Sequence, residues 1–155
     1  MRITLIAVGR LKESYWRDAA AEYLKRMGSY ADVRVVEVAD RDPGRGGEAR
    51  ALADETADVL KALPAGAYVI TLEIAGSQLS SERFSARLGQ LGLEGRSHVA
   101  FIIGGSLGLG APVLAEADER LSFGPMTLPH NLARIVLLEQ VYRAFRIARG
   151  EPYHK

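Results

Sequence analysis

Short runs rich in β-branched and other apolar residues recur along the chain, separated by polar or glycine-containing segments. They occupy residues 3–8, 33–38, 68–72, 98–103 and 120–123. The first run is almost continuously apolar, which is typical of a strand that is covered on both faces of its sheet. The pattern predicts five strands.

Between these runs the apolar residues recur every three or four positions, which is the period of an α-helix. Segment 16–27 carries an apolar stripe at i, i+3, i+4, i+7, i+8 and i+11, and Gly28 follows it as a helix stop. Further helices are predicted over 48–63, up to residue 91 from an N-cap at Ser80 or Ser81, briefly from Pro112, and over 132–149.

Strands and helices alternate from one end of the chain to the other. This alternation predicts an α/β fold with a mostly parallel sheet flanked by helices. The chain has 155 residues and shows neither an internal repeat nor a linker. Because this length is ordinary for one domain, we expect a single domain over residues 1–155.

The last predicted helix is apolar on two sides. One stripe consists of Ile135, Leu138, Tyr142 and Phe145. A second stripe beside it consists of Leu137, Val141, Ala144 and Ala148. One stripe suffices to cover a sheet, so the second predicts contact with a partner subunit in a homodimer. The alternative is that this helix lies deep in the core of a single chain.

The composition is that of an ordinary globular protein, with 48% hydrophobic and 25% charged residues. There is no cysteine, which excludes disulfides, thiolate catalysis and cysteine-ligated metals. His98, His130 and His154 lie far apart in the sequence, so no metal site is expected. Apolar runs are far shorter than the roughly 20 residues of a membrane span, and no signal segment is evident. We expect a cytoplasmic protein without a membrane partner.

Charge is distributed unevenly, although the formal net charge is only +1. The balance is +2 over residues 1–50, −4 over 51–120 and +3 over 121–155. A polyanion would therefore meet the two ends of the sequence rather than its middle, unless the asymmetry is chance scatter. The basic, glycine-rich segment 41–47 is either a flexible connection or an arm that contacts phosphate.

Three loops are expected at the carboxyl ends of strands, where parallel sheets bind their ligands: 72–76, 104–110 and 123–128. The glycine-rich loop 104–110 lacks the spacing and the lysine of a nucleotide-phosphate loop. Ser106 lies between glycines but lacks the spacing of a hydrolase nucleophile. These loops therefore predict a ligand site that binds through backbone groups, without NTP hydrolysis or hydrolase chemistry.

Four segments form a more specific combination. They are Ile103-Gly104-Gly105, FGPMTLPH at 123–130, EQVYRAF at 139–145 and PYHK at 152–155. In this order, and in a chain of this length, they resemble the bacterial ribosomal RNA large subunit methyltransferase H family of the SPOUT class. The resemblance covers the whole chain.

This resemblance implies a C-terminal trefoil knot, a homodimer and S-adenosyl-L-methionine as methyl donor. The implied reaction is N3-methylation of a pseudouridine in the inter-subunit stem-loop of 23S rRNA, in the assembled 70S ribosome. Carried over from the family, the residues expected to bind the cofactor are Leu72, Gly104, Phe123, Gly124, Pro125, Met126, Thr127 and Leu128.

The implied reaction requires one proton to leave the base, and no metal. His154 is expected to accept this proton or to orient the base, because histidine titrates near neutral pH. Tyr153 is expected to stack on the base or to orient it. Arg143 and Lys155 are the expected contacts to RNA. A tail that becomes ordered only on binding would explain the same residues.

Two other classes of function remain open. One is a non-catalytic, flavodoxin-like nucleotide-binding module, although the basic segment 9–12 after the first strand lacks the acidic residues of such a receiver. The other is a ribosome-associated scaffold that binds RNA without modifying it. Binding of S-adenosyl-L-methionine discriminates the methyltransferase from both.

Overall fold

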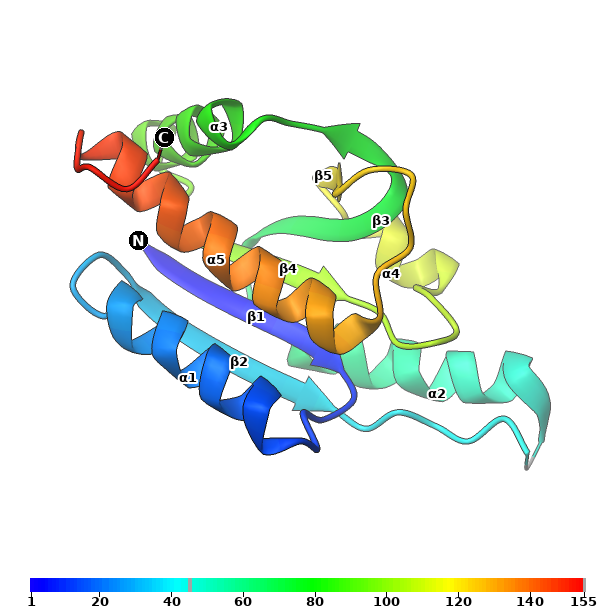
Figure 1. Ribbon diagram of the computed structural model, residues 1–155. Helices are drawn as coiled ribbons and strands as arrows, with labels where there is room; N and C mark the ends of the chain where they lie inside the picture. The colour runs from blue at the N-terminus through cyan, green and yellow to red at the C-terminus, as the bar shows by residue number, and fades with distance from the viewer. Residues whose placement is uncertain (45, 155) are drawn as a thin grey trace.

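Five strands form one sheet in the computed structural model, which describes residues 1–44 and 46–154 (Figure 1). They lie in the order β2-β1-β4-β3-β5, and every pairing is parallel. The predicted α/β fold with a mostly parallel sheet is therefore confirmed, whereas the trefoil knot stays a prediction. The strands are β1 (Arg2–Val8), β2 (Asp32–Val38), β3 (Tyr68–Gln78), β4 (His98–Ile103) and β5 (Glu119–Ser122).

Helices cover both faces of this sheet, which explains the apolar strand sequences. On one face lie α1 (Ser14–Met27), α3 (Ser81–Leu93) and α5 (His130–Ala148), and they pack on side chains such as Ile3 and Leu5 of β1. On the other face lie α2 (Gly47–Ala62) and α4 (Ala111–Ala115), over Ile6 and Val8. Successive residues of β1 therefore enter different cores, and both must be apolar.

The crossovers share one hand. The connections β1–β2 and β3–β4 run in one direction across the sheet with their helices on one face. The connections β2–β3 and β4–β5 run back with their helices on the other face, as parallel sheets require. The flavodoxin-like order is 2-1-3-4-5, so the observed order excludes that arrangement.

Strand β3 is longer than its apolar run predicts. It pairs with β5 at Leu72, is irregular over the next residues, and pairs again at Ser77 and Gln78. Segment 72–76, expected to be a loop, is therefore the irregular middle of a strand. The sequence pattern missed it because this part of β3 is largely exposed, so no apolar alternation marks it.

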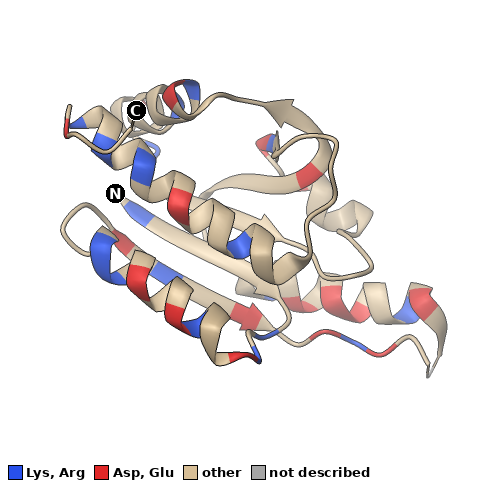
Figure 2. Cartoon of the chain, viewed as in Figure 1, with Lys and Arg blue, Asp and Glu red and all other residues tan. Residues whose placement is uncertain are grey.

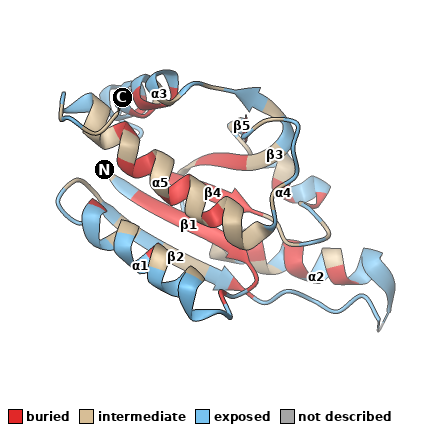
Figure 3. Ribbon diagram, in the orientation of Figure 1, coloured by how far each residue is buried: buried red, intermediate tan, exposed pale blue. Residues whose placement is uncertain are grey.

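Helix α5 lies between α1 and α3 and crosses the sheet over β4 (Figures 1 and 3). Leu137, Val141 and Ala144 of its second stripe are at most 2% exposed within the single chain. The interpretation of this stripe as a contact with a partner subunit is therefore wrong, because helices on both sides require apolar contacts. Leu132 and Val136 are half-buried and lie outside the core cluster.

Helix boundaries otherwise follow their local signals. The Oγ of Ser80 accepts a hydrogen bond from the Arg83 backbone amide, which confirms Ser80 as the N-cap of α3.

In the described parts of the chain, no helix combines the length and apolar character needed to cross a membrane.

Candidate active site

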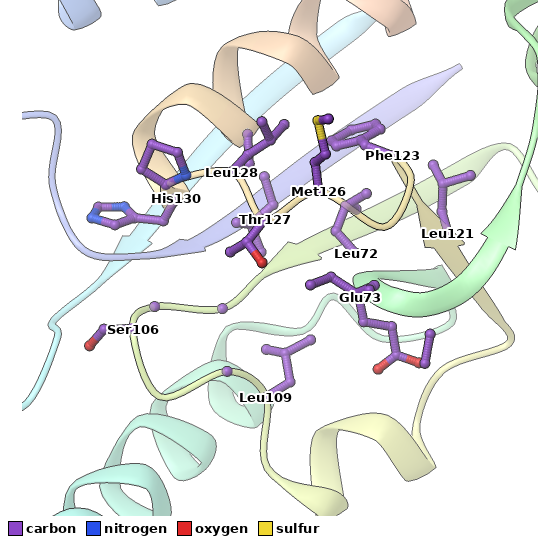
Figure 4. A pocket seen from close by; sticks show the side chains of 18 of the residues that line it. Leu72, Glu73, Ser106, Leu109, Leu121, Phe123, Met126, Thr127, Leu128 and His130 are labelled. Carbon is purple, nitrogen blue, oxygen red and sulfur yellow. The ribbon is translucent and has the colours of Figure 1, made fainter.

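A cavity of about 690 Å³ opens at the carboxyl ends of β3, β4 and β5 (Figure 4). This volume is within the range of small-molecule sites, which is about 300–1,000 Å³. Most of its wall is apolar or glycine backbone. The residues that form this wall include Leu72, Ile103, Gly104, Leu109, Leu121, Phe123, Met126 and Leu128.

Three distant segments meet in this cavity, and they are the segments predicted to bind the cofactor. Leu72 comes from β3, Gly104 follows β4, and the loop 123–128 connects β5 with α5. Within that loop Pro125 does not belong to the cavity lining, whereas its neighbours do. The meeting follows from the parallel sheet, because the carboxyl ends of β3, β4 and β5 share one edge.

The glycine-rich loop after β4 folds back closely on itself. The Gly108 amide donates a hydrogen bond to the Gly105 carbonyl at 3.1 Å. A Cβ on Gly104 would lie only 2.8 Å from the carbonyl carbon and oxygen of Gly108. A side chain at Gly104 would therefore collide with the glycine-rich loop itself.

Two ionisable side chains line the cavity among the described residues, and the sequence interpretation assigned a role to neither. Glu73 has a buried Oε1 without a hydrogen-bond partner, 3.5 Å from Arg120 Nη1. His130 has a buried Nδ1 without a partner. The sequence does contain a signal for each of these two residues. Glu73 directly follows Leu72, a predicted cofactor residue, and His130 ends the motif at 123–130.

These features suit a nucleoside-sized ligand. Flat apolar rings find contact on Leu121 and Phe123, and the glycine loop lets a ligand approach the backbone. The Glu73 carboxylate on the cavity wall is an acceptor suited to hydroxyl groups, the role that acidic residues play toward ribose in other parallel-sheet proteins.

The C-terminal tail is docked rather than frayed. Tyr153 donates a hydrogen bond to Glu139 Oε1 at 3.2 Å, and its ring meets that of Tyr142 edge-on, with centroids 5.0 Å apart. His154 Nε2 lies 2.6 Å from Glu82 Oε1, and its Nδ1 accepts from Arg143 at 3.2 Å. Both ring nitrogens of His154 are therefore occupied, so proton acceptance requires at least one contact to break.

This docking site lies far from the cavity of the same chain. The cavity borders the first turn of α5, whereas the tail packs beside Arg143. Arg143 lies thirteen positions after His130 in α5, which corresponds to about 20 Å along the helix. The structure does not bring the predicted catalytic residues Tyr153 and His154 to the predicted cofactor residues within one chain.

Arg143, predicted to contact RNA, contacts the protein itself. Its guanidinium pairs with Glu139 at 2.6 Å and lies 4.7 Å from the centroid of the Tyr153 ring. Lys155, the other predicted RNA contact, lies outside the described residues.

Hydrogen bonds from the Glu82 backbone amide, from Ser80 and from His154 lower the pKa of Glu82 to about 2, so this carboxylate is charged at neutral pH.

The basic loop between β2 and α2 is also partly tied to the protein. Arg41 pairs with Asp58 at 2.6 Å, and its backbone amide donates to Glu55. Arg45 lies outside the described residues. Whether this loop contacts phosphate stays a prediction.

A family model covers nearly the whole of this fold, including all the segments that line the cavity. The family whose model matches residues 1–154 is described as "Predicted SPOUT methyltransferase". The chain therefore belongs to the SPOUT methyltransferase family.

Curated relatives narrow this assignment. Proteins named "Ribosomal RNA large subunit methyltransferase H" from Bifidobacterium adolescentis and from Listeria monocytogenes are 51% and 52% identical to this chain over 159 aligned residues. Each match covers 100% of both chains. The predicted resemblance to this family is confirmed.

Solved structures support the same fold. A probable methyltransferase from Bordetella pertussis has a TM-score of 0.57 at 20% identity and covers 93% of this chain and 96% of its own. A probable methylase family protein from Haemophilus influenzae has a TM-score of 0.54 at 15% identity, and the match covers 99% of this chain and 70% of that one.

Proposed function

We propose that this protein transfers a methyl group from S-adenosyl-L-methionine to N3 of a pseudouridine in the inter-subunit stem-loop of 23S rRNA, in the assembled 70S ribosome. The observation that carries the proposal is the single cavity shared by Leu72, Gly104 and the loop 123–128. Full-length relatives named for methylation of large-subunit rRNA support the choice of substrate.

The cavity wall suits this donor. Leu121 and Phe123 offer apolar contact to adenine, and the Glu73 carboxylate is an acceptor for the ribose hydroxyls. A bound sulfonium supplies an electrophilic methyl group that needs no metal. What the protein must do is align the acceptor nitrogen with that methyl group and accept one proton.

The proposed methyl transfer balances in atoms and in charge. The imide N–H of the base loses its proton, a nitrogen–carbon bond forms, and the carbon–sulfur bond breaks with its electron pair on sulfur. A protein group within hydrogen-bond reach of N3 must hold the proton. We assign this role to His154, with Tyr153 stacking on the base or orienting it.

A homodimer reconciles the tail with the cavity. Within one chain the tail lies at the far end of α5 from the cavity, so Tyr153 and His154 would serve the cavity of the partner subunit. Basic residues gather near the same end of the molecule, close to both termini (Figure 2). An antiparallel pairing of subunits would bring this basic end, with Arg143, toward the partner's cavity and its RNA.

The reaction is tested on ribosomes from cells that lack the activity. The protein is supplied with S-adenosyl-L-methionine labelled in its methyl group, and the modified nucleoside is identified by mass spectrometry. We expect label in one N3-methylated pseudouridine of the 23S rRNA. Label at another nucleotide, or ribosomes that stay unlabelled while the protein binds the cofactor, would contradict the proposal.

The dimer is tested by mixing two variants that should each be inactive alone, Gly104→Val with a defective cavity and His154→Ala with a defective tail. If each site combines the cavity of one subunit with the tail of the other, one site of every heterodimer is intact. Random mixing then restores about a quarter of wild-type activity, because half of the dimers are heterodimers. If tail and cavity act within one subunit, mixing restores nothing.

A further inference from the structure

The carboxyl edge of the sheet continues beyond the cavity. The cavity opens at the ends of β3, β4 and β5, while β1 pairs with β4 and β2 pairs with β1 (Figure 1). Because all five strands are parallel, the loops after β1 and β2 lie along the same edge as the cavity. The loop after β1 borders the cavity, since a Cβ on Gly9 would lie 3.0 Å from Cε1 of His130, a residue of the cavity wall.

Several contacts fix the backbone of this loop. Arg134 Nη2 donates to the Gly9 carbonyl at 3.0 Å, and Arg134 Nη1 pairs with Glu37 at 2.6 Å. The same Glu37 oxygen accepts the Leu11 amide at 3.3 Å, and Arg17 donates to the Leu11 carbonyl at 3.2 Å. Arg134 is only 1% exposed, so its contacts are made away from water, where they are strong. The loop is therefore a firm support for the side chains that it carries.

Three side chains point outward from this support. Leu11 is buried in the core, whereas Arg10 and Lys12 on either side of it are exposed. Tyr15, in the first turn of α1, is 63% exposed. We call Arg10, Lys12 and Tyr15 the β1-loop surface. Two cations beside an exposed aromatic ring are the side chains with which proteins bind single-stranded RNA, through phosphates and through stacked bases.

The cations of the β1-loop surface are available to a ligand. Neither Arg10 nor Lys12 forms an ion pair with another residue in the described part of the chain, whereas Arg143 at the far end of α5 pairs with Glu139. Glu13 is the only acidic residue of segment 9–15. The β1-loop surface therefore offers free positive charge beside the cavity.

The path of the substrate brings RNA to this surface. An acceptor base must reach the methyl group of a donor bound in the cavity, as in other enzymes that modify a base in a pocket. The backbone of the same nucleotide stays outside, so the phosphates on either side of it pass over the cavity rim. The β1-loop surface lies on that rim, next to His130.

We propose that Arg10 and Lys12 bind RNA phosphates next to the target nucleotide and that Tyr15 stacks on a neighbouring base. This assignment rests on the proposed function, because it takes rRNA as the substrate. It adds an RNA contact on the subunit that carries the cavity, apart from the tail.

The phosphate contacts are tested by methylation kinetics with ribosomes as the varied substrate. The double variant Arg10→Ala/Lys12→Ala should raise the KM for ribosomes about tenfold, while kcat and the affinity for S-adenosyl-L-methionine stay at wild-type values. The dependence of log KM on log salt should become shallower by roughly 1.5, because each phosphate contact contributes about 0.7 to 0.9 to this slope. A loss of packing alone would not change the slope.

The stacking contact has its own pair of variants. Tyr15→Ala should raise the KM for ribosomes about tenfold without changing the salt slope, because stacking involves no counterion release. Tyr15→Phe keeps the aromatic ring and should retain the wild-type KM. An equal effect of both substitutions would overturn the stacking assignment.

Lys61→Glu is the matched control for Lys12→Glu, because both reverse one charge. Lys61 is exposed in the last turn of α2, which leads to the opposite edge of the sheet. Only Lys12→Glu should raise the KM for ribosomes. Equal increases in the two variants would assign the effect to net charge and overturn the proposal, as would an unchanged KM in Arg10→Ala/Lys12→Ala.

Two further outcomes are distinguishable from these. Dissociation of a dimeric wild type into monomers on substitution of Arg10 and Lys12, measured by sedimentation, would assign the β1-loop surface to a partner subunit and overturn the RNA contact. A wild-type protein that binds S-adenosyl-L-methionine but methylates no ribosome would instead contradict the proposed function.

Discussion

At the scale of single residues, the cavity depends on the close approach of backbone segments, and the tail depends on the half-buried phenol of Tyr153. Gly104 lies where any Cβ would meet the Gly108 backbone at 2.8 Å. Tyr153 is held by its hydrogen bond to Glu139 and by the Arg143 guanidinium on its ring. Each contact can be changed by a single substitution.

Gly104→Ala should lower the affinity for S-adenosyl-L-methionine at least about tenfold, because the glycine loop must move to admit the methyl group. Calorimetric titration measures the affinity, and circular dichroism checks that the variant is folded. Gly89→Ala is the control, since its Cβ meets nothing within 4 Å and it lies in α3. We expect it to stabilise the protein by about 1 kcal/mol without affecting binding. Unchanged affinity in folded Gly104→Ala would disprove the placement of the loop.

The Tyr153 phenol should titrate with a midpoint above pH 10. Burial, and then the negative charge of Glu139, raise the pKa of Tyr153 above its ordinary value. The folded protein thus favours the neutral phenol, whose contribution to stability is complete below the unfolded value of about 10 and is lost as the pH rises through the folded pKa. The ultraviolet difference titration of wild type against Tyr153→Phe measures this pKa. A titration midpoint below pH 10 would contradict the burial argument.

At the scale of elements, α5 determines both the core and the predicted subunit contact. Its inner side fills the space between α1 and α3, where Val141 is 2% exposed. Its outer side presents Leu132 and Val136, which are half-buried and outside the core cluster. If a partner subunit covers α5, it does so on this outer side.

Two aspartate substitutions separate these roles. Val141→Asp places an unpaired carboxylate in the core and should lower the free energy of unfolding by about 4 kcal/mol or more. Val136→Asp should leave the fold intact but weaken the dimer by about 2 kcal/mol, roughly 30-fold in Kd. Sedimentation equilibrium and urea unfolding measure the two quantities. A Val136→Asp dimer of wild-type affinity would exclude the outer side of α5 as the interface, and a monomeric wild type would exclude the dimer.

At the scale of the whole molecule, charge limits how the protein can recognise RNA. A dimer carries a formal charge of only about +2, whereas a tight nucleic-acid binder neutralises roughly 6 to 10 phosphates. Several of the basic side chains near the termini are already paired, such as Arg26 with Glu22 and Arg146 with Glu151. The molecule therefore offers a shallow footprint rather than a continuous basic surface.

Methylation should consequently depend on the assembled ribosome. We expect the 70S ribosome to be methylated at least about tenfold faster than free large subunits or an isolated stem-loop. The reason is that binding to RNA alone, without the other surfaces of the ribosome, would need more phosphate contacts than this protein offers. The three substrates are compared at equal salt with labelled methyl donor. Equal rates on all three would mean that local RNA contacts suffice and would refute the charge argument.

Local patterns were enough to predict the fold class and most elements. Burial against the sheet requires apolar residues at regular positions within one element. It therefore leaves a pattern that can be recognised in the sequence, as in the apolar runs of β1 and β4 and the helical stripe of α1. The motifs at 123–130 and 152–155 likewise identified the family before any geometry was known. β3 beyond Leu72 escaped prediction, because exposed backbone pairing leaves no hydrophobic signature.

Only the tertiary structure decided which of these residues meet. Parallel pairing in the order β2-β1-β4-β3-β5 assembles the cavity from three segments far apart in the chain. The same packing brings His130 and Glu73 to its wall and separates His154 from it by most of the length of α5. These relations depend on long-range contacts between elements, whereas periodicity and composition report only on the neighbourhood of each residue.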